Sequence, residues 1–159
     1  MDFLFTPWRR KYVVEGENRT DGCVFCRIQE EGEPDFLLET ERWFMVLNAY
    51  PYCNGHMMLV PKRHLAWLGE LDAEELAEMG GLLRRAEAAL REAYRPEGMN
   101  LGINIGSAGG AGVPGHLHIH LLPRWSGDTN FMTTLGRARV LPEEPAQSFE
   151  RIQKALENA

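Results

Sequence analysis

The sequence has no long hydrophobic run, little cysteine and no excess of positive charge. No segment is apolar enough to span a bilayer and no secretory signal peptide is recognisable, so we expect a cytoplasmic protein. Three cysteines in 159 residues do not suggest the disulfide framework of a secreted protein. A net charge of −6 argues against a nucleic-acid partner. Internal repeats and low-complexity tracts are also absent from the sequence.

The remaining composition is that of an ordinary globular protein. Hydrophobic residues make up 44% and charged residues 25% of the chain, which is long enough for one domain with a substantial core. We therefore expect a single domain over residues 1–159. It would have a core over about 20–141, an N-terminal extension over 1–20 and a C-terminal helix over about 144–157.

Hydrophobic periodicity predicts a sheet. Strands are expected over 36–39, 43–48 and 56–61, separated by turn-forming residues. Alternating Leu101, Ile103 and Ile105 predict a further strand that carries Asn104 on its opposite face.

One long helix is predicted between these strands. Asp72 and Glu75 form the pattern of a capping box at its start, and residues 96–98 end it. The apolar stripe that we expect to pack on the sheet consists of Leu76, Met79, Leu83, Ala86 and Leu90.

The most informative segment alternates histidine with apolar residues. His116, His118 and His120 are separated by Leu117 and Ile119. In an extended strand alternate side chains point to opposite faces, so the three imidazoles would share one face and the apolar residues would bury the other. Such a row can carry out nucleophilic, acid–base or metal chemistry near neutral pH.

Three interpretations of this row compete. It is an amphipathic strand with a solvated histidine face, or a purely metal-binding row, or a site where one imidazole is a covalent nucleophile and its neighbours contact phosphate and metal. The glycine-rich segment 104–115 precedes it. By itself that segment would be a flexible connector, but glycine lets backbone N–H groups approach a phosphate closely. Its position next to the histidines favours the third interpretation.

With these motifs, the sequence resembles the histidine triad (HIT) family of nucleotide hydrolases and transferases. The resemblance covers roughly residues 6 to 141. It rests on the histidine row, Asn48, the segments 51–56 and 60–64, and Asn104-x-Gly106. Segments 5–9 and 123–131 are similar to the bacterial diadenosine tetraphosphate phosphorylase-like branch, which is related to the fragile-histidine-triad hydrolases.

The resemblance implies roles for particular residues. His118 would attack the α-phosphorus and form a nucleotidyl-histidine intermediate, with its other ring nitrogen bonded to a backbone carbonyl in the preceding glycine-rich segment. His120 would stabilise charge on the phosphate. Asn48 would bind the ribose hydroxyls. The phosphate would be held by Asn104, Gly106, Ser107, Gly110 and Gly112. Trp125 would lie near the polyphosphate or second base, or else be a core or interface aromatic.

One departure from the family pattern narrows the reaction. Hydrolytic members usually carry Gly-Gln-Ser or Gly-Gln-Thr just upstream of the triad, whereas this chain has Gly110-Ala-Gly112-Val113. The missing amide weakens a simple hydrolase interpretation. It agrees with a branch in which inorganic phosphate, rather than water, releases the nucleotidyl group.

A second chemical motif is the pair Cys23 and Cys26. Two cysteines at this spacing are zinc ligands, a redox pair or a coincidence, and no βαβ pattern supports a redox pair. Several HIT proteins complete such a site with two histidines, which correspond here to His64 and His116. The resemblance therefore implies a closed, structural zinc site with two cysteine and two histidine ligands. The other histidine, His56, is expected to be a hydrogen-bonded structural residue at the pocket edge.

The resemblance also implies an α+β fold with an antiparallel sheet of about five strands, and a homodimer. The expected activity is cleavage of dinucleoside polyphosphates at the α-phosphate, by phosphorolysis. One alternative is a nucleoside phosphoramidate or nucleotidyl-adduct hydrolase of the Hint-like branch. Another is a zinc-stabilised nucleotide-binding module without turnover.

Overall fold

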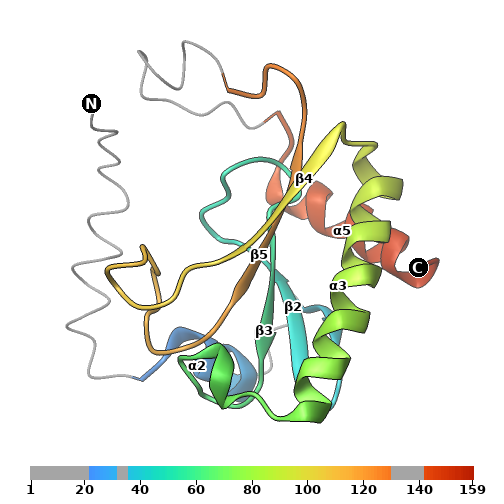
Figure 1. Ribbon diagram of the computed structural model, residues 1–159. Coiled ribbons are helices and arrows are strands. Elements are labelled where there is room, and N and C mark those ends of the chain that lie inside the picture. Colours follow the sequence, from blue (N-terminus) through green and yellow to red (C-terminus); the bar gives the residue numbers. More distant parts are fainter. Residues whose placement is uncertain (1–21, 32–35, 130–141) are drawn as a thin grey trace.

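The computed structural model describes residues 22–31, 36–129 and 142–159, and within them it contains one antiparallel sheet (Figure 1). The sheet has five strands in the order β1-β2-β3-β5-β4. Its strands are β1 (Phe36–Glu39), β2 (Trp43–Leu47), β3 (Met57–Pro61), β4 (Gly98–Ile103) and β5 (Ile119–Arg124). The predicted α+β class and strand number are confirmed. The expected N-terminal extension lies outside the described residues.

Within the described residues, three α-helices and a short 3-10 helix accompany the sheet. They are α2 (Val24–Glu31), η1 (Leu68–Glu70), α3 (Ala73–Tyr94) and α5 (Pro145–Glu157). Helices α3 and α5 pack against each other on one face of the sheet, with α5 crossing behind α3 (Figure 1). None of the helices within the described ranges combines the length and apolar character that a membrane crossing requires.

The strands divide their side chains between two separate hydrophobic clusters. On β2, Trp43 and Met45 belong to the cluster that includes residues of α3 and α5, whereas Phe44 and Val46 belong to a smaller cluster with Phe25 of α2. Strand β3 alternates in the same way. This is the period of two that a strand imposes, and here both faces of the central strands are buried.

Helix α3 begins as the sequence predicts, and four of the five residues of the predicted stripe, Met79, Leu83, Ala86 and Leu90, belong to the core or pack against it. The Asp72 side chain accepts from the N–H of Glu75, and the Glu75 carboxylate accepts from the N–H of Asp72, which forms the capping box. The predicted stripe is partly wrong because Leu76 is exposed. The side chains of α3 that are buried are Glu75, Leu82, Ala86, Ala89 and Leu90.

Strands β4 and β5 differ from their predicted bounds. Strand β5 begins only at Ile119, after two of the three histidines, and β4 ends at Ile103, before Asn104. Leu101 is exposed because β4 is the last strand of the sheet and its outer edge carries no strand among the described residues. The expected antiparallel pairing is present, with Gly102 opposite His120.

Candidate active site and metal centre

The histidine row lies on the sheet face opposite α3 and α5. Although β5 begins at Ile119, the alternation starts earlier, because Leu117 and Ile119 both belong to the cluster formed with these helices. His116, His118 and His120 are exposed by only 1%, 3% and 8%. This burial excludes the interpretation of a solvated histidine face.

His118 is held in one tautomer by the backbone. Its Nδ1 lies 2.8 Å from the carbonyl oxygen of His116, and because a carbonyl can only accept, Nδ1 carries the proton. The lone pair is therefore on Nε2. Burial lowers the pKa of His118, which favours the neutral ring. The acceptor is the residue just after the glycine-rich segment and not, as expected, within it.

His120 is oriented by a second chain of hydrogen bonds. The backbone N–H of Tyr52 donates to Nδ1 of His56 over 3.1 Å, so the proton of His56 is on Nε2. That nitrogen lies 2.9 Å from Nδ1 of His120 and donates to it. His120 consequently carries its own proton on Nε2, as a donor. His56 is 1% exposed and hydrogen-bonded, as the sequence predicts, but its partner is a member of the triad.

The turn that carries Tyr52 and His56 is attached to the helical layer. Gly55 has a φ of 75°, and a Cβ on it would lie 2.7 Å from the ring of Tyr94 in α3. The side chain of Asn54 donates to the backbone carbonyl of Glu143, whose carboxylate accepts from the Tyr94 hydroxyl. These hydrogen bonds hold the turn against α3. Position 55 requires glycine, because only glycine both adopts this φ and leaves room for the Tyr94 ring.

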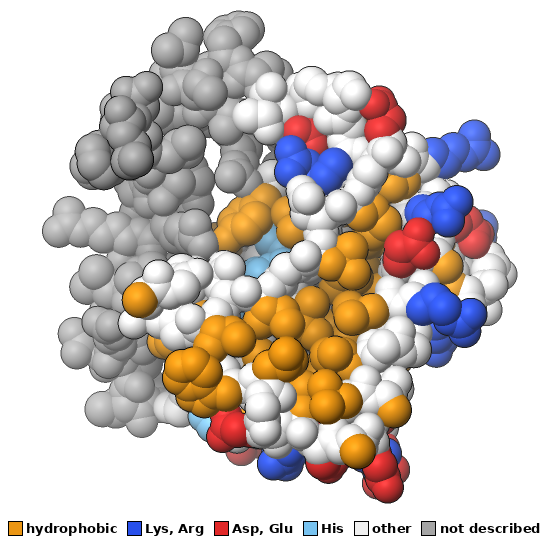
Figure 2. All heavy atoms as spheres, viewed as in Figure 1, with side chains coloured by type: hydrophobic (Ala, Val, Ile, Leu, Met, Phe, Trp, Pro, Cys, Tyr) orange, Lys and Arg blue, Asp and Glu red, His pale blue; other side chains and the backbone are white. Residues whose placement is uncertain are grey.

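A pocket opens over His118 and His120. Histidine side chains are visible in a hollow of the surface next to hydrophobic side chains (Figure 2). The residues that line the pocket are Phe25, Asn48, Tyr50, Tyr52, Met58, Gly110, Gly112, Val113, His118 and His120. Sequence reasoning named Asn48, the two glycines and the two histidines. It missed the aromatic residues, although Tyr50 and Tyr52 follow Asn48 at alternate positions.

The glycine-rich loop contributes less than the sequence predicts. Asn104, Gly106 and Ser107 are not among the residues that line the pocket. The side-chain amide of Asn104 lies 3.4 Å from the carbonyl of Gly110 and braces the loop. The N–H groups of residues 109–111 donate to carbonyls of the loop itself. Those three N–H groups are therefore already hydrogen-bonded within the loop, so fewer donors of the expected phosphate site point to a ligand.

Trp125 also lies outside the pocket lining. Its ring meets Tyr94 edge-on, with the centroids 6.1 Å apart, and its backbone N–H donates to Asp128. The guanidinium of Arg124 pairs with both oxygens of Asp128 and holds the pKa of that carboxyl well below its usual range. Trp125 is thus a packed aromatic at a tight turn.

Two cysteines and two histidines meet beside the row. The ligand atoms of Cys23, Cys26, His64 and His116 all lie within 4.8 Å of one another. Sγ of Cys23 is 3.2 Å from Nδ1 of His116, and Sγ of Cys26 is 3.3 Å from Nδ1 of His64. The four residues that the sequence proposed as metal ligands therefore form one cluster.

The chemistry of this cluster fits a zinc ion. Tetrahedral Zn²⁺ with sulfur and imidazole ligands separates S and N by about 3.6 Å, close to the observed separations. Nε2 of His116 donates to the carbonyl of Pro61 over 2.8 Å, which leaves Nδ1 free of a proton and able to coordinate. Burial and the neighbouring Cys23 raise the pKa of Cys26 to about 11, so without a cation the Cys26 thiol keeps its proton near neutral pH.

The segment 61–65 connects the parts of this cluster. Its carbonyls accept from the ring of His116 at Pro61, from Gln29 of α2 at Lys62, and from the N–H of Leu117 at Leu65. His64 lies within the same segment. The segment that carries His64 is thereby hydrogen-bonded to the segment that carries His116 and to α2, at whose start the two cysteines lie.

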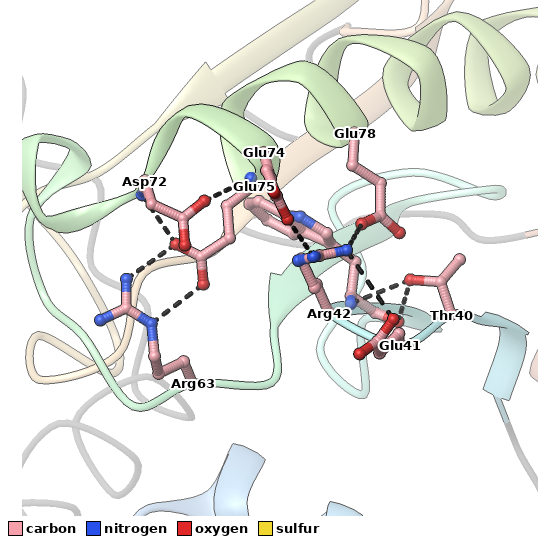
Figure 3. Close-up of polar contacts among 9 residues, drawn as sticks. Thr40, Glu41, Arg42, Arg63, Asp72, Glu74, Glu75 and Glu78 are labelled. Atoms are coloured by element: carbon pink, nitrogen blue, oxygen red, sulfur yellow. Dashed lines mark hydrogen bonds and ion pairs between the residues drawn. The ribbon is translucent and has the colours of Figure 1, made fainter.

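An ion pair anchors this segment to α3 (Figure 3). The guanidinium of Arg63 donates to both oxygens of Glu75, over 2.9 and 2.7 Å, and also to the carbonyl of Glu70. Arg63 holds the pKa of Glu75 below its usual range. Nearby, Arg42 pairs with Glu74 and Glu78 of the same helix. The residue before His64 is thus attached to the capping box of α3.

Comparison with known proteins identifies the family. The model of the HIT domain matches residues 29–127. The chain belongs to the HIT family. An AP-4-A phosphorylase from Mycobacterium tuberculosis is 34% identical to this HIT protein over 149 residues, which cover 88% of this chain and 76% of that protein. An adenylylsulfatase from Arabidopsis thaliana is 32% identical over 112 residues, covering 70% and 56%.

A solved structure of a zinc-bound protein resembles this HIT protein in fold. A Zn-bound histidine triad family protein from Mycobacterium smegmatis matches with a TM-score of 0.71 and 29% identity, covering 86% of this chain and 94% of that one. The sheet and its helices are shared with that fold. In this HIT protein the Cys/His cluster and the buried triad lie on the same side of the sheet, joined through His116.

Proposed function

We propose that the protein is a nucleotidyl-transferring enzyme that cleaves dinucleoside polyphosphates at the α-phosphorus, with inorganic phosphate as acceptor. The observation that carries the proposal is the buried, neutral imidazole of His118. Its Nδ1 donates to the backbone, so Nε2 keeps a lone pair in a side chain that lines the pocket. A nucleophile fixed in this tautomer needs no general base to become reactive.

In the first step, the Nε2 lone pair of His118 attacks the α-phosphorus. The bond from phosphorus to the bridging oxygen breaks, and its electron pair leaves with the remaining nucleoside polyphosphate. A phosphoramidate bond to the enzyme results. The N–H of His120, held outward by His56, stabilises the negative charge on the equatorial phosphate oxygens. Asn48 lies at the pocket wall, where its amide would bind the ribose hydroxyls.

In the second step, an oxygen of inorganic phosphate attacks the same phosphorus and the P–N bond breaks. The electron pair returns to Nε2 of His118, and a nucleoside diphosphate is released. Two observations support phosphate over water as the acceptor. The relative that is 34% identical is named a phosphorylase, and the chain has Gly112-Val113 where hydrolytic members carry an amide side chain.

Product analysis separates the possible reactions. With diadenosine tetraphosphate, phosphorolysis yields ADP and ATP only when phosphate is present. Formation of AMP and ATP at a rate indifferent to phosphate would contradict the phosphorolytic step and support hydrolysis. Absence of both reactions, with AMP still bound, would support the nucleotide-binding module.

A nucleotidyl-adduct or phosphoramidate hydrolase is the second candidate. The relative named adenylylsulfatase favours it, since the 32% identity spans 70% of this chain. The same His118 would then transfer its nucleotidyl group to water. Comparing the rates on adenosine phosphoramidate and on diadenosine tetraphosphate decides between the two substrate classes.

We propose that Cys23, Cys26, His64 and His116 hold a structural Zn²⁺ ion. With four protein ligands, such a site has no open position for water, so the ion supplies cross-linking rather than catalysis. The support is the cluster itself and the Zn-bound relative. Stoichiometric zinc in the purified protein, together with two thiols that become titratable after chelation, is the expected result. Absence of zinc with both thiols reactive would remove this proposal.

We further propose a cytoplasmic homodimer without a nucleic-acid partner. Hydrophobic side chains gather on the face that carries β4 and α3 (Figure 2). The exposed large hydrophobic side chains include Trp67, Leu68, Leu76 and Leu101. A second copy paired along β4 would cover this surface, because an exposed strand edge is a template for another strand. Light scattering of the native chain and of Leu101→Glu tests the dimer, and an unaltered mass for the variant would contradict this interface.

A further inference from the structure

Phe25 lies between the metal centre and the active site. In sequence it falls between the two cysteines of the cluster. In the fold it is 3% exposed, and its ring centroid is 5.4 Å from that of His116 and 5.3 Å from that of His118. It also lines the pocket. One aromatic side chain therefore touches a candidate metal ligand, the candidate nucleophile and the space that the substrate would fill.

His116 provides a parallel connection. Its Nδ1 faces the two sulfur atoms, and its backbone carbonyl accepts the hydrogen bond that fixes the tautomer of His118. A cation bound to this ring restrains the residue whose carbonyl orients the nucleophile. The metal cluster thus reaches His118 through a ring contact and through a backbone hydrogen bond.

Helix α2 depends on its contacts with the rest of the fold. It is eight residues long, and a helix of this length is marginal without tertiary contacts. Its side chains reach other elements through Gln29, which donates to the carbonyl of Lys62, and through Cys26, whose Sγ lies 3.3 Å from Nδ1 of His64. Its apolar contacts centre on Phe25. The cysteines at its start and the pocket wall at Phe25 therefore depend on the same short element.

We infer that binding of a divalent cation to the Cys/His cluster and binding of a nucleotide in the pocket are thermodynamically coupled, with Phe25 as the positioning residue that carries the coupling. Whichever ligand binds first orders α2, so the second binds to an element already in place. Linkage then requires that each ligand raise the affinity for the other by the same factor. The inference rests on the proposed nucleotide site.

The experiment measures both affinities on the full chain. AMP is titrated by calorimetry into zinc-loaded and chelator-treated protein, and Zn²⁺ affinity is measured by competition with a chelating dye, with and without saturating AMP. We expect zinc to tighten AMP binding about five- to fiftyfold, and AMP to tighten zinc binding by the same factor. The dye competition needs no metal-free stock, so it remains informative if chelated protein unfolds.

Phe25→Leu tests the residue itself. The variant keeps an apolar side chain but loses the ring contacts, so both ligands should still bind while the coupling factor falls towards one. Phe36→Leu is the matched control, because Phe36 packs on Phe44 in the same cluster and does not line the pocket. The coupling factor of this variant should stay at the wild-type value. If circular dichroism shows Phe25→Leu to be unfolded, Phe25→Met takes its place.

The outcomes distinguish this inference from the proposed function. Equal AMP affinity with and without zinc overturns the coupling and leaves the nucleotide site intact. Full coupling in the Phe25 variant overturns the role of that residue. No AMP binding by either form overturns the proposed function and the inference with it.

Discussion

The two faces of the sheet are made by the same strands but are closed by different means. One face packs on the long helices α3 and α5, with a continuous aliphatic core that includes Leu59, Ile119 and Leu121. The other face holds the triad and is closed by the short α2, the turn before His56 and the glycine-rich loop. Long elements stabilise the first face, whereas local hydrogen bonds and the cluster of candidate metal ligands organise the second. Stability and chemistry are thus separated across one layer of backbone.

Adjacent residues on opposite faces provide the sharpest test of this separation. Replacing His118 by alanine removes the attacking nitrogen, so turnover of diadenosine tetraphosphate should fall by about a thousandfold or more. AMP affinity and the free energy of unfolding should change little. Steady-state kinetics, calorimetry and urea denaturation provide the three measurements. A variant with near wild-type turnover would show that another group is the nucleophile.

Leu117→Ala is the complementary change on the opposite face. Leu117 is 2% exposed in the core with α3, and truncation of a buried leucine costs about 2–4 kcal/mol of unfolding free energy. Turnover per folded molecule should remain within about threefold of wild type, because the alanine keeps the backbone bond to Leu65. Urea denaturation and active-site-normalised rates test this. A large catalytic loss without loss of stability would contradict the division between the faces.

His56 tests how far the catalytic face depends on orientation. Without its N–H, Nδ1 of His120 loses the donor that fixes its tautomer. We expect His56→Ala to lower kcat by about tenfold to a hundredfold, less than removal of a whole oxyanion donor, with a smaller effect on KM. His56→Gln, which retains a side-chain N–H, should recover part of the rate. Equal losses in both variants would indicate a packing role instead.

The smallest effect is expected at the ion pair that joins segment 61–65 to α3. Because Arg63 lowers the pKa of Glu75, ionised Glu75 stabilises the fold above its unfolded pKa, and this contribution is lost as the pH falls through the lower, folded pKa. Glu75→Gln should therefore show a weaker decline in unfolding free energy between about pH 6 and pH 3. Glu87→Gln, which alters an exposed pair with Arg91, is the control and should follow wild type.

Local signals predicted the scaffold well. Asp72 and Glu75 form the capping box that their spacing indicates, and the strands over 36–39 and 43–47 follow their apolar runs. The four residues of the metal cluster were expected from the family resemblance, and the structure brings them together. These features depend on short spacings or on a shared motif, which is why the sequence alone is informative about them.

Features that depend on tertiary packing were not predicted. The helix α2 was missed because it has only eight residues, although Val24, Phe25 and Ile28 recur at helical spacing and pack in one cluster. The stripe on α3 was misjudged at Leu76, since the arrangement of α5 and the sheet decides which side is buried. The pairing of His56 with His120 spans 64 positions, and no local pattern encodes a distance of that kind.

The row of rings that ends at His120 has a fixed polarity. It starts from the peptide N–H of Tyr52, which can donate but has no lone pair with which to receive, so the order of donors and acceptors cannot be reversed. This order therefore provides no route for a proton from His120 through His56 to the peptide group of Tyr52. His120 therefore presents an N–H, and no lone pair, to the pocket, which agrees with the charge-stabilising role proposed for it and not with a role as a second nucleophile.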